Sequence, residues 1–134
     1  MYERKIKILH IDDEEAQLVF TKYFLQNLDK AFIVESISDP QEALRLATNN
    51  HYDIIISDYK MEKMNGIQLA IQLKKKNNIP FILYTGQDTS ELIDSALQSG
   101  VDYYVRKEVD PSHYHLLSRR IRHAIEANQI ASIT

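Results

Sequence analysis

The sequence contains no cysteine among its 134 residues. Disulfide bonds, thiolate nucleophiles and metal sites built from cysteine are therefore all excluded. The absence agrees with a reducing compartment, and we expect a cytoplasmic protein. A chain of this length buries roughly two-thirds of the surface that its unfolded form exposes, so one hydrophobic core can stabilise the fold without covalent cross-links.

A large excess of one charge and a long apolar run are missing as well. The net charge of -3 gives no general attraction to nucleic acids or to anionic membranes. The N-terminal segment MYERKIKILHIDDEE has only a short apolar run before its acidic pairs, so it matches neither a signal peptide nor a membrane span. Repeats, low-complexity runs and linkers are also absent. We expect a single soluble domain over residues 1–134, with its core at about 5–126 and a C-terminal tail at 127–134, and no direct binding to nucleic acid or membranes.

Short apolar segments alternate with segments of helical spacing along the chain. Strands are expected at residues 6–11, 31–37, 53–58, 81–84 and 101–105. Helices are expected at about 14–29, from Asp39-Pro40, from Asn65-Gly66, from Thr89 or Ser90 to Gly100, and from Asp110 until the pattern fades after Asn128. Because crossovers between parallel strands are right-handed, this alternation produces a parallel sheet with helices on both faces.

We therefore predict an α/β fold, a three-layer flavodoxin-like sandwich with a five-stranded parallel sheet and five helices. Periodicity alone does not determine the order of the strands. We favour the order 2-1-3-4-5, because acidic residues follow both the first and the third strand and this order makes those strands neighbours.

The segment YDIIISDYKMEKMNG, residues 52–66, is the most informative part of the chain. Its run of three isoleucines, Ile54 to Ile56, is typical of a strand that is covered on both faces. Asp58 follows that strand directly. Open α/β sheets bind their ligands at the carboxyl ends of their strands, so we predict that Asp58 is the reactive group.

Asp12 and Asp13 follow the first strand and are expected beside Asp58. Three carboxylates so close together cannot all stay ionised without a cation between them. Oxygen ligands at a partly open site suit Mg²⁺, or Mn²⁺ in its place. Thr85 adds a hydroxyl after the fourth strand and Lys107 adds an ammonium after the fifth. This set suits phosphoryl transfer to a carboxylate.

In this combination the chain resembles the receiver domain of two-component response regulators, the fold of the chemotaxis regulator. The resemblance covers about residues 5–126 and is carried by Asp12-Asp13, the D-x-x-M-x-x-x-x-G pattern from Asp58 to Gly66, Thr85-Gly86, Gly100 and Lys107. It implies that Asp58 accepts a phosphoryl group, in a Mg²⁺-dependent reaction, from the phosphohistidine of a sensor histidine kinase or phosphotransfer protein. It also implies that the domain is not an enzyme beyond assisting its own phosphorylation and dephosphorylation.

The same resemblance implies a role for each site residue. The metal would be bound by Asp12, Asp13, Asp58 and the backbone carbonyl of Lys60. The phosphoryl group would contact Thr85, Gly86 and Lys107. Thr85 and Tyr104 would form the switch, with Tyr104 filling the space that Thr85 vacates. The switch would change the face made by the fourth helix, fifth strand and fifth helix, where an unknown output partner or a second copy of the chain would bind.

Two positions depart from the receiver pattern. Receivers usually carry a proline in a cis peptide bond after the lysine, whereas Glu108 follows Lys107 here. A cis bond without proline costs roughly 3 kcal/mol, so we expect this loop to be either strained or rearranged to trans. Glu62 likewise replaces the proline common after the motif methionine, Met61. Neither change removes a chemical group from the site.

Two other functions need residues that this chain does not have at the required positions. A Mg²⁺-dependent phosphatase of the haloacid-dehalogenase type needs a second aspartate two residues after the nucleophile, where this chain has Lys60. A flavin mononucleotide site needs a loop rich in hydroxyls and glycine after the first strand, where this chain is acidic. A receiver fold that serves only as an unphosphorylated docking module remains the first alternative, and a Mg²⁺-dependent phosphatase ranks below it. The chain is either a stand-alone receiver or a domain of a longer regulator or hybrid kinase.

Some residues are assigned structural roles. His10, inside the first strand, is expected to be a packed core residue rather than a ligand. Tyr103 and Tyr104 are expected on opposite faces of their strand, one in the core and the other available for switching. The basic cluster at residues 119–123 is interpreted as a solvated helix face or a salt-bridged dimer surface.

Lys60 and Gln87 lie two residues after Asp58 and Thr85, at positions that tune phosphoryl lifetime in the family. We predict that Lys60→Ala changes the rate at which the phosphorylated protein loses its phosphoryl group. The measurement is the decay of phosphorylated protein after the phosphodonor is removed. An unchanged decay rate would count against this role for Lys60.

Overall fold

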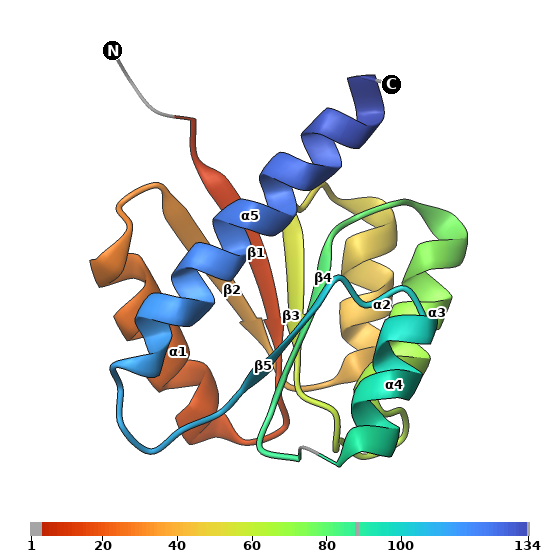
Figure 1. The fold of residues 1–134 in the computed structure, drawn as a ribbon, viewed down its shortest axis with the longest axis horizontal. Coiled ribbons are helices and arrows are strands. Elements are labelled where there is room, and N and C mark those ends of the chain that lie inside the picture. Colours follow the sequence, from red (N-terminus) through yellow and green to blue (C-terminus); the bar gives the residue numbers. More distant parts are fainter. Residues whose placement is uncertain (1–3, 88, 134) are drawn as a thin grey trace.

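Five strands and five helices alternate along the part of the chain that the structure describes, as the sequence predicts. The computed structural model describes residues 4–87 and 89–133. The elements, in chain order, are β1 (Ile6–Ile11), α1 (Glu15–Leu28), β2 (Phe32–Ile37), α2 (Pro40–Asn49), β3 (Ile54–Ser57), α3 (Gly66–Lys76), β4 (Phe81–Thr85), α4 (Ser90–Gln98), β5 (Tyr103–Arg106) and α5 (His113–Ile133) (Figure 1). Within the described residues, no helix combines the length and the apolarity that crossing a membrane requires.

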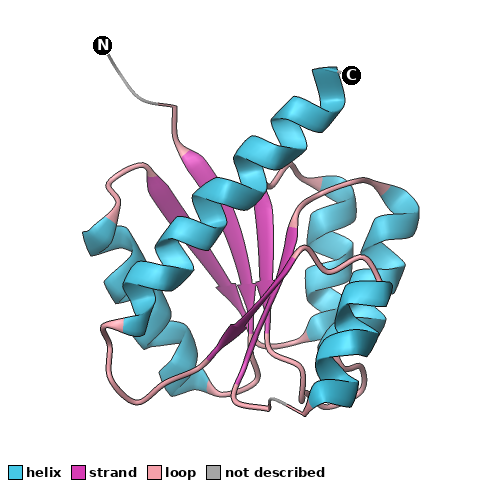
Figure 2. Ribbon diagram, in the orientation of Figure 1, coloured by secondary structure: helices cyan, strands magenta, loops and turns pink. Residues whose placement is uncertain are grey.

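The strands form one parallel sheet in the order β2-β1-β3-β4-β5, which confirms the predicted order. All strands point to the same edge, which lies away from the C-terminal end of α5 (Figure 2). β1 and β3 are neighbours at the centre, with Ile11 paired to Ser57. The residues that follow these two strands therefore emerge side by side at the carboxyl edge.

Two hydrophobic clusters cover the two faces of the sheet. α1 and α5 pack on one face through residues such as Leu25, Tyr114 and Leu117, whereas α2, α3 and α4 pack on the other face. The isoleucines of β3 alternate between the clusters, and all three are fully buried. A fully buried isoleucine stabilises the fold by about 1.5–3 kcal/mol, so this strand anchors both layers directly before Asp58.

Side-chain caps begin three of the helices at the predicted residues. Asp39 accepts a hydrogen bond from the backbone N–H of Gln41, at 3.0 Å. Asn65 and Gln68 form a reciprocal capping box at the start of α3. Of the two candidates for α4, Thr89 is the N-cap. The cap of α3 is the most relevant to the site, because it ends the loop that follows Asp58.

The C-terminal tail predicted at residues 127–134 is helical in its described part, because α5 continues to Ile133. The apolar periodicity fades because these residues no longer face the sheet. Alanine and glutamine, as in Ala127, Gln129 and Ala131, still favour helix, so the backbone continues regularly with mostly exposed side chains. Thr134 lies outside the described residues.

The two tyrosines of β5 also differ from the expectation that one is core and the other available. Tyr103 packs against the cluster under α5, whereas Tyr104 packs against the opposite cluster. They do lie on opposite faces, but both are half-buried. The reason is that β5 is an edge strand, where each face of the sheet is only partly covered.

Gly66→Ala is expected to destabilise the protein by about 1–3 kcal/mol. A Cβ atom at this position would lie 2.2 Å from the backbone oxygen of Asp58 and 2.8 Å from Cδ1 of Leu83, so the backbone would have to move. Gly86→Ala is the matched control, because no described atom beyond its two neighbours in the chain lies within 4 Å of the added carbon. Urea denaturation measures both free energies of unfolding. Equal stability of the two variants would contradict the close packing at Gly66.

Candidate functional site

Most of the predicted site residues lie at or just after the carboxyl ends of four different strands, whereas Tyr104 lies within β5. Hydrogen bonds between backbones extend past the strand ends and fix their positions. The N–H of Asp58 donates to the carbonyl of Ile11 at 3.0 Å, and the N–H of Lys107 donates to the carbonyl of Thr85 at 3.0 Å. The regular sheet therefore positions these residues, rather than flexible loops.

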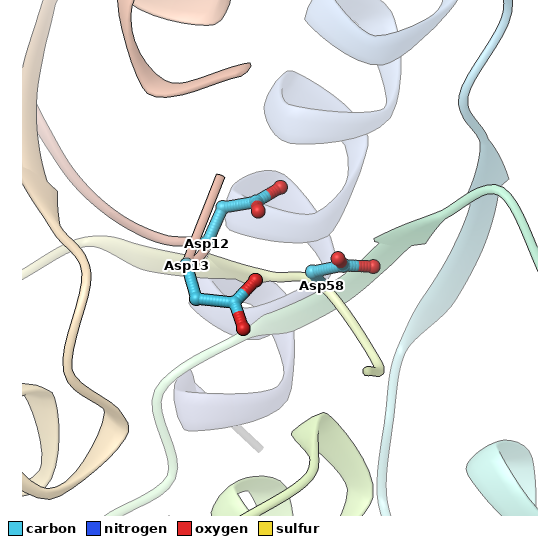
Figure 3. Close-up of side chains that lie close together, drawn as sticks. All are labelled: Asp12, Asp13 and Asp58. Atoms are coloured by element: carbon cyan, nitrogen blue, oxygen red, sulfur yellow. The ribbon is translucent and has the colours of Figure 1, made fainter. Parts of the chain in front are cut away.

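Asp12, Asp13 and Asp58 form a carboxylate cluster. One oxygen from each residue lies within 4.8 Å of the others, and the side chains converge from the ends of β1 and β3 (Figure 3). Asp12 is fully buried, Asp58 is 9% exposed and Asp13 is exposed, so the cluster leads from the interior to the surface. Three carboxylate oxygens in a cluster that opens to solvent at Asp13 fit a hard divalent cation such as Mg²⁺.

Lys107 supplies the positive charge of the site. Its Nζ lies 2.6 Å from Oδ2 of Asp12 and 3.2 Å from Oδ2 of Asp58. The other oxygens accept backbone hydrogen bonds, Oδ1 of Asp12 from Glu14 at 2.9 Å and Oδ1 of Asp58 from Tyr59 at 2.8 Å. Each of these two carboxylates is thus bound by one backbone donor and by one shared ammonium.

Burial and ion pairing act on these groups in opposite directions. Burial raises the pKa of Asp12 above its ordinary value, and this outweighs the lowering by Lys107 and by the N–H of Glu14. For Lys107, burial lowers the pKa, but the hydrogen bond and charge of Asp12 and the charge of Asp58 outweigh it, so the net pKa is raised. The ammonium is therefore firmly charged at neutral pH.

A cavity of about 530 Å³ opens over the cluster. Its lining residues are Asp13, Glu14, Asp58, Lys60, Thr85, Gly86, Gln87 and Lys107. Glu14 is the one member of this lining that the sequence did not assign to the site. Asp12 and Tyr104 do not line the cavity. Asp12 is buried against Lys107, and Tyr104 lies within β5, before its carboxyl end.

Gln87 links the two predicted switch residues. Thr85 is almost fully buried, and its hydroxyl oxygen accepts a hydrogen bond from the N–H of Gln87 at 3.3 Å. The hydroxyl of Tyr104 donates to the carbonyl of Gln87 at 2.5 Å. Thr85 and Tyr104 are therefore connected through the backbone of one residue.

The loop after Lys107 adopts one of the two predicted arrangements. The described residues contain no cis peptide bond, so the Lys107–Glu108 bond is trans. The carboxylate of Glu108 lies 3.7 Å from Nε of Arg106. The negative charge of Glu108 therefore lies close to the positive charge of Arg106 on β5.

His10 and Tyr84 lie beneath the site, and both are fully buried. The imidazole of His10 is packed in the sheet, as the sequence predicts, and neither ring nitrogen has a hydrogen-bond partner among the described residues. Burial, with a smaller effect of the Lys107 charge, lowers its pKa to about 3. Tyr84 was not assigned to the site, yet the Nζ of Lys107 lies 5.8 Å from the centre of its ring.

Comparisons with known proteins indicate the family and the fold of the chain. The family model for the response regulator receiver domain matches residues 8–119. The transcriptional regulatory protein SrrA of Staphylococcus aureus is 33% identical over 107 residues, which are 78% of this chain and 43% of SrrA. The chain therefore spans less than half the length of this curated relative.

Solved receiver domains have the same fold. The Francisella response regulator 1452 receiver domain matches with a TM-score of 0.82 and 29% identity, over 92% of this chain and 99% of that domain. A receiver domain protein from Clostridium thermocellum matches with a TM-score of 0.82 and 31% identity, over 94% and 98%. A CheY-like receiver domain protein from Methanospirillum hungatei matches with a TM-score of 0.83 and 26% identity, over 95% and 98%.

His10→Val is expected to weaken the loss of stability in acid. The pKa of His10 is lowered from 6.5 to about 3, so between these values the unfolded chain binds a proton that the native protein does not. This contribution to stability is present above pH 6.5 and is lost as the pH falls toward 3, at about 1.4 kcal/mol per pH unit. Urea denaturation at several pH values measures the slope.

The exposed His115 provides the control for this experiment, because His115→Gln removes a histidine from the same chain without removing a buried one. That variant should keep the wild-type slope. If wild type and His10→Val lose stability equally steeply between pH 6.5 and pH 4, the imidazole is not buried in its neutral form.

Proposed function

Because this chain belongs to the response regulator receiver domain family, we propose that Asp58 is the phosphoacceptor of a two-component phosphorelay. The main support is that the Asp58 carboxylate borders an open cavity while its Oδ2 lies 3.2 Å from the ammonium of Lys107. A carboxylate oxygen attacks phosphorus, and the bond between phosphorus and the donor's histidine nitrogen breaks. The donor is a sensor histidine kinase or a phosphotransfer protein.

Asp12, Asp13 and Asp58, with the backbone carbonyl of Lys60, are the proposed ligands of Mg²⁺ or Mn²⁺. The cation, when bound, supplies positive charge that stabilises the phosphoryl oxygens during transfer. The net charge of the side chains at this site suits a divalent cation. The carboxylate cluster and Lys107 together carry a net charge of about -2 when all four groups are ionised, which a divalent cation neutralises.

Thr85, Gly86 and Lys107 are proposed to bind the transferred phosphoryl group. All three line the cavity beside Asp58. The backbone N–H of Gly86 and the hydroxyl of Thr85 are donors, and Lys107 contributes an ammonium. Lys107 is already held between Asp12 and Asp58, so a small movement brings it to a phosphoryl oxygen on Asp58. The domain assists its own phosphorylation and dephosphorylation and acts on no separate substrate.

The signal is proposed to leave the site through Thr85 and Tyr104. Phosphorylation adds a charge of about -1.5 to -2, and Thr85 moves to donate to it. Because Gln87 bonds to both Thr85 and Tyr104, this movement breaks or shifts both contacts. Tyr104 then turns inward and changes the face formed by α4, β5 and α5. That face would bind the output partner or a second copy of the chain.

An exposed apolar surface beside the site supports a protein as the phosphodonor. On α1, Val19, Phe20 and Tyr23 are 61%, 55% and 63% exposed. Phe20 also lines a cavity of about 450 Å³ that reaches Lys107. A donor that covered these side chains would bring its phosphohistidine to Asp58. We propose that the donor and this domain meet in the cytoplasm, the compartment expected from the sequence. An unphosphorylated docking module would not need this cavity and its charged groups.

Incubation with acetyl phosphate and Mg²⁺ is expected to add one phosphoryl group to Asp58. Mass spectrometry of the intact protein and of its peptides measures the extent and the position. Asp58→Asn should abolish the modification, because an amide oxygen is a far weaker nucleophile, and chelation of the metal should abolish it in wild type. Modification of wild type at another residue, or none in a folded sample, would overturn the proposal.

A further inference from the structure

The loop that follows Lys107 has little packing of its own. Its residues 108–111 are all exposed, and Val109 is as exposed as in an extended chain. Lys107 nevertheless holds its ammonium within hydrogen-bonding distance of two carboxylates. The far end of this loop must therefore be fixed by contacts outside it.

His113, the first residue of α5, makes those contacts. Its Nδ1 lies 2.7 Å from the backbone oxygen of Asp110, and its Nε2 is hydrogen-bonded to the hydroxyl of Tyr84. A carbonyl oxygen can only accept, so Nδ1 carries the proton and donates. The Nε2 of the neutral ring then accepts from Tyr84. The imidazole thus ties the end of the loop to β4.

Tyr84 connects His113 to Lys107. The His113 ring stacks against the Tyr84 ring, with 5.7 Å between their centres and 19° between their planes. The ammonium of Lys107 lies 5.8 Å from the centre of that same ring, close enough for attraction between the cation and the π electrons. The ring under the lysine is therefore held at its hydroxyl end by His113, and Tyr114 and Thr21 also interact with that hydroxyl.

We propose that Tyr84 and His113 are positioning residues that aim Lys107 at Asp12 and Asp58. They act through the lysine and do not touch the transferred phosphoryl group. The inference rests on the proposed function, because the aim of Lys107 matters to phosphoryl transfer only when Asp58 accepts phosphate. Lys107 alone then supplies the charge, and the tyrosine–histidine pair reduces the freedom of its side chain and loop.

The test is the rate of Asp58 phosphorylation by acetyl phosphate at saturating Mg²⁺. Tyr84→Phe removes one hydroxyl and keeps the ring, and His113→Ala removes the whole link. Each should slow phosphorylation by about three- to tenfold. His113→Gln restores an acceptor for the tyrosine and should recover part of the rate. His115→Ala, at an exposed position on the same helix, should match wild type.

A double-mutant cycle separates positioning from general structural damage. In a Lys107→Ala background, Tyr84→Phe and His113→Ala should slow phosphorylation no further, because the group that they aim is gone. An equal slowing in both backgrounds would overturn the inference, and so would wild-type rates in Tyr84→Phe. If His113→Ala fails to unfold cooperatively, Tyr84→Phe and its cycle carry the test. Failure of wild type to gain phosphate would overturn the proposed function, and with it this inference, whereas phosphorylation of wild type with no coupling to Lys107 overturns the inference alone.

Discussion

The ion pair between Lys107 and the buried carboxylate of Asp12 is the interaction on which the rest of the site depends. Asp12 is fully buried, and an isolated carboxylate there would be strongly disfavoured. The ammonium 2.6 Å away offsets part of that penalty and reaches Asp58 with the same atom. Removing one partner of a buried pair leaves an uncompensated charge, which costs about 3–5 kcal/mol in proteins. The fold therefore keeps a cation beside Asp58, the proposed phosphoacceptor.

The pair also explains why the carboxylates occupy different depths. Asp12 is neutralised from within by Lys107, whereas Asp13 is exposed and is available to an external cation. Asp58 lies between them, in contact with the lysine and with the cavity. Depth in the sheet thus separates a buried carboxylate that contacts Lys107 from one that faces solvent.

Much of this arrangement could be predicted from local sequence patterns. The isoleucine run before Asp58 indicates a strand buried on both faces, and Asp39-Pro40 and Asn65-Gly66 begin helices through short-range hydrogen bonds. The acidic residues after two strands indicate that these strands are neighbours. Once the strand order is known, the convergence of the carboxylates follows, since parallel strands end at one edge.

Other features depend on contacts that no local pattern contains. The hydrogen bond between Tyr84 and His113 joins residues 29 positions apart, and neither residue belongs to a motif. Gln87 connects Thr85 to Tyr104 only because its carbonyl accepts a hydrogen bond from the hydroxyl of Tyr104 on β5. The extension of α5 was missed for a different reason. Apolar residues recur at helical spacing only where a helix packs against another surface, and the end of α5 does not pack against the sheet.

The ends of the Asp12–Lys107 contact are 95 residues apart in the chain. A pairing across so long a segment is costly in entropy and forms only when the intervening strands have assembled. Intermediates in which β5 has not yet joined the sheet lack the ammonium, whatever secondary structure they already contain. A partly folded chain therefore has an incomplete site, and the complete set of charged groups comes together only late in folding.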